Sequence, residues 1–280
     1  MNDIKSALAW ALTVLEKEPS DARLVAEVLL SYLLAKNRTY LLTYPEKKLS
    51  EEQITHYKEL ILKRAQGTPI AYLTGEREFW SLALTVNQHT LIPRHETERL
   101  VELALELLPA HAPLNILDLG TGSGAIALAL ASERPQWQIT ACDKSKEALN
   151  IAQDNARQLK LSNVVFYQAD WFDGLPKTHY HAIVSNPPYI AIDDPHLKQG
   201  DVRFEPLSAL VSGQQGLADL HYIITQSYTY LLPKGLILLE HGYDQKNSIR
   251  AILNELDYCK VQCWQDISGQ DRVSGGWKPE

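Results

Sequence analysis

Residues 114–134, LNILDLGTGSGAIALALASER, combine a short apolar strand, a glycine-rich turn and an apolar helix. The turn, Asp118-Leu119-Gly120-Thr121-Gly122-Ser123-Gly124, can bend sharply because glycine adopts backbone conformations that other residues rarely do. A strand that runs through such a turn into a helix is typical of parallel α/β sheets, in which ligands bind at the carboxyl ends of the strands. This stretch therefore predicts both the fold class and the place of a site.

Strand-like and helical segments alternate through the rest of the chain. Helical patterns cover residues 146–160 and 217–232. Five further apolar strand segments are residues 137–143, 163–170, 180–190, 235–242 and 258–267. Short apolar strands between helices indicate a mainly parallel sheet that is covered on both faces.

Residues 1–75 are predicted to form a small helical bundle. The first apolar face has the spacing i, i+3, i+4, i+7, which is that of an amphipathic helix, at Leu8, Ala11, Leu12 and Leu15. A second helix is expected to start at Ser20 and Asp21, residues of the type that cap helix N-termini.

A third helix in this region has signals at both ends. Ser50 and Gln53 have the spacing of a capping box, in which each side chain bonds the other residue's backbone N–H. Gly67 suits the left-handed residue that ends many helices.

Residues 79–93, FWSLALTVNQHTLIP, are rich in β-formers and predict a hairpin with its turn near Asn87. The chain is thus expected to comprise a helical bundle (1–75), which would dock the substrate, a β-hairpin linker (76–95) and an α/β domain (96–280).

Composition limits the class of protein. A hydrophobic fraction of 45% over 280 residues argues for a packed core and against disorder. The net charge of -7 speaks against a protein that tracks a nucleic-acid backbone. The sequence has neither a signal peptide nor an apolar run that could cross a bilayer, and its three cysteines lack a CxxC pair. We expect a cytoplasmic protein with reduced thiols and no membrane association.

One acidic and one aromatic residue, each at the end of a strand, indicate which ligand the glycine turn binds. Asp143 ends the next strand, at the position where a carboxylate accepts hydrogen bonds from ribose hydroxyls. Trp171, after the third strand, offers a flat ring for adenine, although tryptophan is also a common core residue. NAD and S-adenosylmethionine both present an adenosine group, so these residues suit either ligand. The spacing Gly120-x-Gly122-x-Gly124 lacks the last glycine of G-x-G-x-x-G and favours S-adenosylmethionine.

Asn186-Pro187-Pro188-Tyr189, at the end of the fourth strand, indicates the reaction. An amide nitrogen is a poor nucleophile because its lone pair is delocalised into the carbonyl group. An enzyme can accept hydrogen bonds from both of its N–H groups, which orients the nitrogen and raises its electron density. The side-chain oxygen of Asn186 and the backbone oxygen of Pro187 are suited to this task.

The other members of this tetrapeptide support the same chemistry. Pro187 and Pro188 have a fixed φ and no N–H, so they hold the two oxygens in place. Tyr189 can stack on a planar acceptor group. The sequence therefore predicts methyl transfer to a planar, amide-type nitrogen.

Together these residues resemble those of the protein-(glutamine-N5) methyltransferases that modify peptide chain release factors. The resemblance spans the chain and is carried by DLGTGSG (118–124), Asp143, DWF (170–172) and NPPY (186–189), with support from residues 91–98, 203–206 and 269–273. Family members commonly have proline where this chain has His95, which affects no expected catalytic residue.

The resemblance implies a class I S-adenosylmethionine-dependent methyltransferase domain, Rossmann-like with a seven-stranded sheet, behind a helical bundle and a hairpin. It implies that Gly120, Thr121, Gly122, Ser123 and Gly124 hold the methionine end of the cofactor, that Asp143 binds ribose and that Trp171 lies at adenine. Asn186, Pro187, Pro188 and Tyr189 would receive the glutamine of a Gly-Gly-Gln motif in class 1 release factors, with Asn186 also touching the cofactor. S-adenosylhomocysteine would be the product, and the methylation would aid translation termination.

Three alternatives remain at this stage. The same tetrapeptide serves DNA adenine N6-methyltransferases, which hold a polyanion and flip a base, and the net charge argues against them. A glutamine of a ribosomal protein is an alternative substrate that is chemically closer to the release-factor glutamine than DNA adenine is. A non-catalytic S-adenosylmethionine sensor would not need two aimed acceptors.

Two further segments have both a functional and a structural interpretation. Arg94, Glu96 and Glu98 either flank the cofactor pocket or cap the helix that follows them. Glu205 and Pro206 lie in a long loop that either closes over the substrate or only connects elements. The nine histidines have no ligand-like spacing, so we expect no metal.

Overall fold

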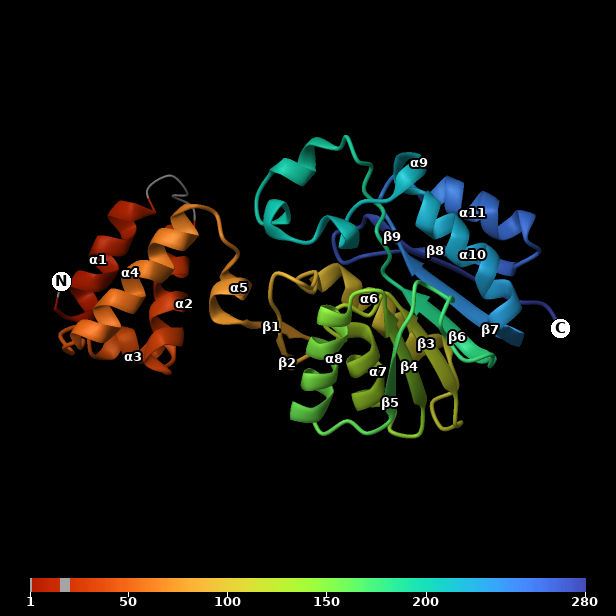
Figure 1. Ribbon diagram of the computed structural model, residues 1–280, viewed down its shortest axis with the longest axis horizontal. Helices are drawn as coiled ribbons and strands as arrows, with labels where there is room; N and C mark the ends of the chain where they lie inside the picture. Colours follow the sequence, from red (N-terminus) through yellow and green to blue (C-terminus); the bar gives the residue numbers. More distant parts are fainter. Residues whose placement is uncertain (1, 16–20) are drawn as a thin grey trace. The chain divides into compact units, whose positions relative to one another are not determined.

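Seven strands form one sheet in the computed structural model, which describes residues 2–15 and 21–280. Their order is β5-β4-β3-β6-β7-β9-β8, with the strand that enters the glycine turn, β3, in the interior of the sheet (Figure 1). The strands are β3 (Asn115–Leu119), β4 (Gln138–Asp143), β5 (Val164–Gln168), β6 (Tyr180–Ser185), β7 (Leu231–Glu240), β8 (Cys259–Gln265) and β9 (Asp271–Trp277). Strands β3 to β7 pair in parallel, and β9 is antiparallel to both β7 and β8. The predicted α/β class with a mainly parallel, seven-stranded sheet is confirmed.

Helices cover both faces of this sheet, as Figure 1 shows. The strands alternate their side chains between two cores, so that Ile116 of β3 belongs to one core and its neighbour Leu117 to the other. The first core joins the sheet to α6 (Glu98–Leu107), α7 (Ala125–Glu133) and α8 (Lys146–Gln158). The second joins it to α10 (Ala218–Tyr230) and α11 (Lys246–Glu255).

Strand β9 was not among the strand segments identified in the sequence. Its Gly275 and Gly276 resemble a turn, because glycine weakens strands and is favoured where the chain bends. In the structure, a Cβ on Gly275 would lie 2.3 Å from the backbone oxygen of Ile237 in β7. Glycine stands here because the two backbones approach too closely for a side chain, which no local pattern reveals.

The predicted hairpin exists, but its predicted turn was wrong. Strands β1 (Glu76–Phe79) and β2 (Leu82–Thr85) are joined by Trp80 and Ser81, which have φ of 52° and 58°. Bulky residues rarely adopt this left-handed conformation. Here the Trp80 N–H donates to Glu98 Oε1 at 3.0 Å, and its indole N–H donates to Glu133 Oε1 at 2.8 Å. Asn87 forms a separate turn after β2, in which its carbonyl accepts from the Thr90 N–H.

The N-terminal region consists of helices, as predicted. They are α1 (Ile4–Val14), α2 (Ala22–Leu34), α3 (Arg38–Thr43), α4 (Glu51–Ala65) and α5 (Ile70–Thr74). Buried side chains between residues 4 and 61 form a core of their own. The Tyr57 hydroxyl donates to the Ala26 backbone oxygen inside this core at 2.9 Å.

The expected apolar face of α1 was partly wrong. Ala11 and Leu15 are buried, but Leu12 is 37% exposed, and the buried face continues through Ile4 and Ala7. The apolar residues at positions 8, 11, 12 and 15 are compatible with more than one buried face of the helix. Packing against α2 and α4 buries the face that carries Ile4, Ala7, Ala11 and Leu15 and leaves Leu12 exposed.

The capping signals had different outcomes. Ser50 Oγ accepts from the Gln53 N–H at 3.1 Å and Gln53 Oε1 from the Ser50 N–H at 2.9 Å, which confirms the capping box. Gly67 has φ of +97° and ends α4 as predicted. Ser20 lies outside the described residues, whereas Asp21 precedes α2 without a side-chain cap hydrogen bond.

The chain divides into two compact units: residues 1–76 with 198–204, and residues 77–197 with 205–280. The segment 198–204, far along the sequence, belongs to the helical unit, where Asp201 Oδ1 pairs with Arg64 Nη1 at 2.9 Å. The hairpin belongs almost entirely to the second unit. The three-part functional division at residues 75 and 95 stays a prediction.

The connection between β6 and α10 contains several short turns of helix. They are η2 (Pro195–Lys198), η3 (Val202–Phe204), η4 (Leu207–Ala209) and α9 (Gly213–Gly216), and another, η1 (His95–Thr97), precedes α6. Among the described helices, none combines the length and the apolar character that a membrane-spanning segment requires.

Candidate active site

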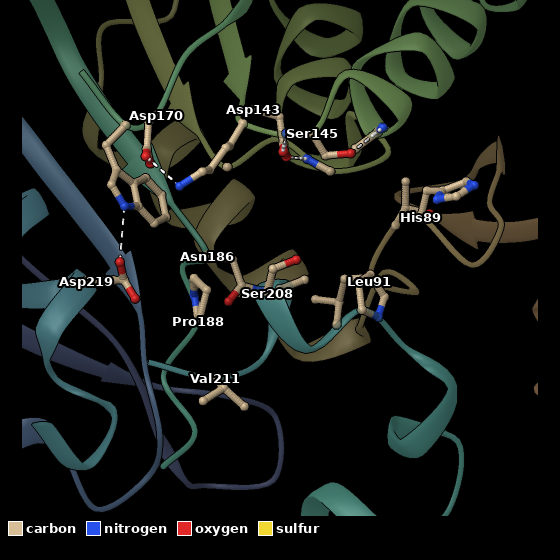
Figure 2. Close-up of a pocket in the computed structure, with 18 of the residues that line it drawn as sticks. His89, Leu91, Asp143, Ser145, Asp170, Asn186, Pro188, Ser208, Val211 and Asp219 are labelled. Carbon is tan, nitrogen blue, oxygen red and sulfur yellow. Dashed lines mark hydrogen bonds and ion pairs between the residues drawn. The ribbon is translucent and has the colours of Figure 1, made fainter. Parts of the chain in front are cut away.

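The carboxyl ends of β3, β4 and β6 meet at one edge of the sheet, because these strands are parallel neighbours. A cavity of about 540 Å³ opens there, within the second unit. Figure 2 shows Asp143, Asp170, Asn186, Pro188 and Asp219 directed toward it, the last from helix α10 and the others from strand ends and loops. The site therefore lies where the opening stretch of sequence predicts it.

The buried side chain of Asp118 holds the glycine turn in place through hydrogen bonds. This carboxyl group is fully buried, and its Oδ2 accepts from the Thr121 hydroxyl at 2.6 Å and from the Ala127 N–H at 3.2 Å. Burial raises the pKa of Asp118 to about 7, although these two hydrogen bonds lower it and the charge of Asp143 adds to the increase. The last acidic residue of β3 thus shapes the turn and does not reach the cavity.

Asp143 joins the turn to the next strand. Its Oδ2 accepts from the Gly122 N–H at 2.9 Å and its Oδ1 from the Ser145 N–H at 2.9 Å. Burial raises the pKa of this carboxyl group, and the Ser145 and Gly122 N–H groups oppose that effect. Because each carboxylate oxygen can accept more than one hydrogen bond, both remain available to a diol in the cavity that Asp143 lines.

Trp171 lies beside the glycine turn in a strained backbone conformation, with φ of 53°. Its indole N–H donates to Asp219 Oδ1 at 3.1 Å, and a Cβ on Gly120 would lie 3.3 Å from its ring. Trp171 and Asp219 both line the cavity. The indole therefore forms a wall of the cavity, held in place by the hydrogen bond that it donates to α10.

Asn186 follows β6 at the same edge. Its Nδ2 donates to Thr97 Oγ1 at 3.0 Å, and its Oδ1 accepts no hydrogen bond from the described residues. Asn186 and Pro188 line the cavity, and the Ser185 hydroxyl donates to the Leu119 backbone oxygen at 2.7 Å. That bond fixes the end of β6 against the strand that enters the glycine turn.

Tyr189 has a different environment from the one expected. Its hydroxyl donates to Glu240 Oε1 at 3.2 Å, and its backbone oxygen accepts from Gln245 Nε2 at 3.0 Å. Burial raises the pKa of this hydroxyl well above its usual range, and the neighbouring Glu240 adds to the effect. Tyr189 does not line the cavity, and stacking on an acceptor group stays a prediction.

The structure thus places six of the residues chosen from the sequence around one cavity. They are Gly120, Gly122, Asp143, Trp171, Asn186 and Pro188. Four others are buried and do not line the cavity: Thr121, Ser123, Gly124 and Pro187. Their cofactor and substrate contacts stay predictions.

The wall opposite the strand ends comes from segments that the sequence only suggested. The lining includes Leu91, Ser208 and Val211 (Figure 2), together with Pro206 and Ala209. Arg94 Nη2 pairs with the buried Glu205 Oε2 at 2.5 Å, which ties the two segments together. Pro206 thus lines the cavity, and Arg94 pairs with the residue before it, whereas closure of this loop over a substrate stays a prediction.

Asp219 and Lys144 were missed by the sequence reasoning, although both line the cavity. Asp219 lies in the first turn of α10, where an acidic residue is common for helix stability alone. Only the pairing with Trp171, 48 positions earlier, distinguishes it. Among the described residues, no cluster of three or more metal-ligating side chains is present.

Comparisons with known proteins agree with this architecture. Residues 6–75 match the PrmC N-terminal domain and residues 93–199 the methyltransferase small domain. A methyltransferase from Pyrococcus furiosus of known structure, 18% identical, has the same fold with a TM-score of 0.55 over 81% of this chain and 100% of that chain. The fold is that of the class I S-adenosylmethionine-dependent methyltransferases.

Sequence relatives define the family more narrowly. The release factor glutamine methyltransferase of Shewanella oneidensis is 52% identical over 98% of this chain and 95% of its own length. That of Vibrio cholerae is 50% identical over 99% of this chain and 98% of its own length. The chain belongs to the release factor glutamine methyltransferase family.

Proposed function

We propose that this protein transfers the methyl group of S-adenosylmethionine to the side-chain amide nitrogen (N5) of the glutamine in a Gly-Gly-Gln motif of class 1 peptide chain release factors. The observation that carries the proposal is the position of Asn186, which lines the cavity beside Gly120 and has its Oδ1 unbonded within the described chain. The names of the relatives support the choice of substrate. The reaction would take place in the cytoplasm, where translation terminates.

The cavity has features that suit S-adenosylmethionine. Its volume falls within the range of about 300–1,000 Å³ that is common for ligand sites. Asp143 offers acceptors for a ribose diol, Trp171 a flat apolar face, and the turn at Gly120 and Gly122 an open approach along the backbone. When bound, the cofactor supplies a methyl group that is electrophilic because it is attached to a positively charged sulfur.

The chain's own residues would prepare the acceptor. Asn186 Oδ1 and the Pro187 backbone oxygen accept hydrogen bonds from the two N–H groups of the glutamine amide. These bonds aim the nitrogen lone pair at the methyl carbon and increase its electron density. The cofactor would supply the methyl group and leave as S-adenosylhomocysteine, and the methylated amide nitrogen would release one proton to solvent.

We expect Asn186→Ala to reduce kcat by about 100-fold or more, because the lost acceptor acts mainly in the transition state. The dissociation constant for S-adenosylmethionine should change by no more than about threefold. Label transfer from methyl-labelled cofactor and calorimetry measure the two quantities. Asn150→Ala, on the exposed face of α8, is the matched control.

Three acceptors test the substrate class: a class 1 release factor, a ribosomal protein mixture and duplex DNA. Label on the Gly-Gly-Gln glutamine is the expected result. Label on DNA or on a ribosomal protein alone, or full turnover by the Asn186→Ala protein, would overturn the proposal.

A further inference from the structure

One buried side chain joins the hairpin to the glycine turn. Asn155, in α8, has no exposed surface. Its Oδ1 accepts from the Thr85 N–H at 2.8 Å, and its Nδ2 donates to the backbone oxygens of Thr85 at 3.0 Å and Ser123 at 2.9 Å. Thr85 ends β2, which lies beside α8 (Figure 1), and Ser123 belongs to the glycine turn. Three segments of the chain therefore meet at a single amide group.

The chemistry of these partners fixes the orientation of the amide. Only the oxygen of an amide side chain can accept a hydrogen bond, and only its NH₂ group can donate. The Thr85 N–H must therefore face Oδ1, and the two backbone oxygens must face Nδ2. Both hydrogens of the NH₂ group are used. Because the amide is buried, loss of these donors would leave backbone oxygens without partners, which is costly.

The glycine turn also packs directly against α8 next to Asn155. Gly124 has φ of +87°, and a Cβ there would lie 3.2 Å from the Cβ of Ala152. Ala152 and Asn155 are three positions apart, so they lie on the same face of the helix. The Gly124 N–H donates to the Thr121 backbone oxygen at 2.8 Å, which closes the turn. Backbone packing and a side-chain hydrogen bond thus act together to fix the turn against α8.

Both segments that Asn155 joins contribute to the wall of the cavity. The glycine turn contributes Gly120 and Gly122, and the segment after β2 contributes residues 89–91. Asn155 itself does not line the cavity. Asp118 and Asp143 hold the turn from β3 and β4, whereas Asn155 connects it to the hairpin. The amide is therefore placed to set the separation of two walls of the site.

We propose, on the basis of the proposed function, that Asn155 is a positioning residue for the cofactor. It holds the glycine turn and the segment after β2 at the separation that S-adenosylmethionine requires. It touches neither the cofactor nor the reacting atoms, and it acts through Ser123 and Thr85.

Asn155→Asp tests this role in the full chain. The substitution keeps the shape and Oδ1 but places a carboxyl oxygen opposite two backbone oxygens. Even when protonated, this group supplies one hydrogen in place of two. We expect the dissociation constant for S-adenosylmethionine, measured by calorimetry, to rise by about tenfold or more. At saturating cofactor, kcat should stay within about threefold of wild type, because Asn186 is unchanged.

Asn163→Asp is the matched control. The Nδ2 of Asn163 donates to the backbone oxygens of Ala131 at 3.2 Å, Arg134 at 3.4 Å and Trp137 at 3.1 Å. Asn163 immediately precedes β5, at the edge of the sheet opposite to the cavity. The same substitution should lower the free energy of unfolding in urea, but leave the cofactor dissociation constant within about twofold of wild type.

Hydrogen exchange in the wild-type protein provides an independent measurement. The Thr85 N–H donates to Asn155, so its exchange requires that this hydrogen bond opens. Thr85 does not line the cavity. A cofactor that binds only the joined arrangement should slow the exchange of this N–H. An unchanged exchange rate at saturating cofactor would overturn the proposal, even if Asn155→Asp failed to fold.

The outcomes separate this proposal from the proposed function. A wild-type dissociation constant in Asn155→Asp, or an equal weakening in Asn163→Asp, would overturn the positioning role and leave the proposed function intact. A wild-type protein that binds S-adenosylmethionine but labels no release factor would instead overturn the proposed function and leave the role of Asn155 in cofactor binding.

Discussion

Asp118 is the residue whose buried charge most affects the glycine turn. A carboxyl group with no exposed surface is costly to ionise, and two hydrogen-bond donors only partly offset that cost. Its pKa is raised from 3.8 to about 7. The turn is thus held by a group that can be neutral near physiological pH.

The raised pKa predicts how stability depends on pH. Because the folded pKa exceeds the unfolded one, the contribution of Asp118 is fully present below about pH 4 and is lost as the pH rises through about 7. Asp118→Asn keeps an acceptor oxygen but cannot ionise. Its stability relative to wild type should therefore increase between pH 4 and 7 and level off above.

Urea unfolding of both proteins at each pH unit from 4 to 8 measures this difference. Taking the difference removes the titration of groups that the two proteins share. A constant difference across the range would show that Asp118 does not titrate as its burial requires.

Among the elements, the segment that follows β6 is held in place by close backbone contact with the end of α9. Gly216, at the end of α9, has φ of +88°, and a Cβ there would lie 2.1 Å from the Tyr189 backbone oxygen. The same oxygen accepts from Gln245 Nε2. Two segments thus fix the chain immediately after the residues expected to bind the substrate.

We expect Gly216→Ala to lower both stability and methyl transfer, because the clash with the Tyr189 backbone oxygen requires one of the two backbone segments to move. Gly269→Ala is the matched control: φ is +78°, and no heavy atom among the described residues lies within 4 Å of its Cβ. That variant should cost only the backbone strain of about 1–2 kcal/mol and leave kcat unchanged. Equal effects of the two variants on kcat would contradict this role of Gly216.

At the scale of the whole molecule, the two units have separate cores. The helical unit packs buried side chains from residues 4–61, whereas the cores around the sheet begin at Phe79. All residues that line the cavity belong to the second unit. Cofactor binding should therefore depend little on the stability of the helical unit.

Ile61→Ala tests this independence. Ile61 is fully buried in α4, so its truncation should destabilise the helical unit by about 2–5 kcal/mol. The neighbouring Leu62→Ala, at a position 50% exposed, should cost far less. Hydrogen exchange of the α1 to α4 amides reports the loss, and calorimetry should give an unchanged cofactor dissociation constant for both variants. A weakening specific to Ile61→Ala would mean that the units are coupled.

Local patterns in the sequence predict most of the helices and strands, the glycine turn and the tetrapeptide at residues 186–189. These features are local, because periodicity, capping and turn chemistry act over a few residues. The hairpin turn at Trp80 was predicted at the wrong place because a hydrogen bond to the distant Glu98 stabilises it. Strand β9 was missed because its glycines are required by close contact with the β7 backbone.

Contacts between residues far apart in the chain become visible only in the folded protein. Thr97 and Asn186 lie 89 positions apart, and Trp171 and Asp219 lie 48 apart. In each pair one residue follows a strand at the carboxyl edge of the sheet, whereas Thr97 lies in η1 and Asp219 in α10. Packing of these short and long helices against the sheet brings the partners together, and a sequence pattern that acts over a few residues does not contain this information.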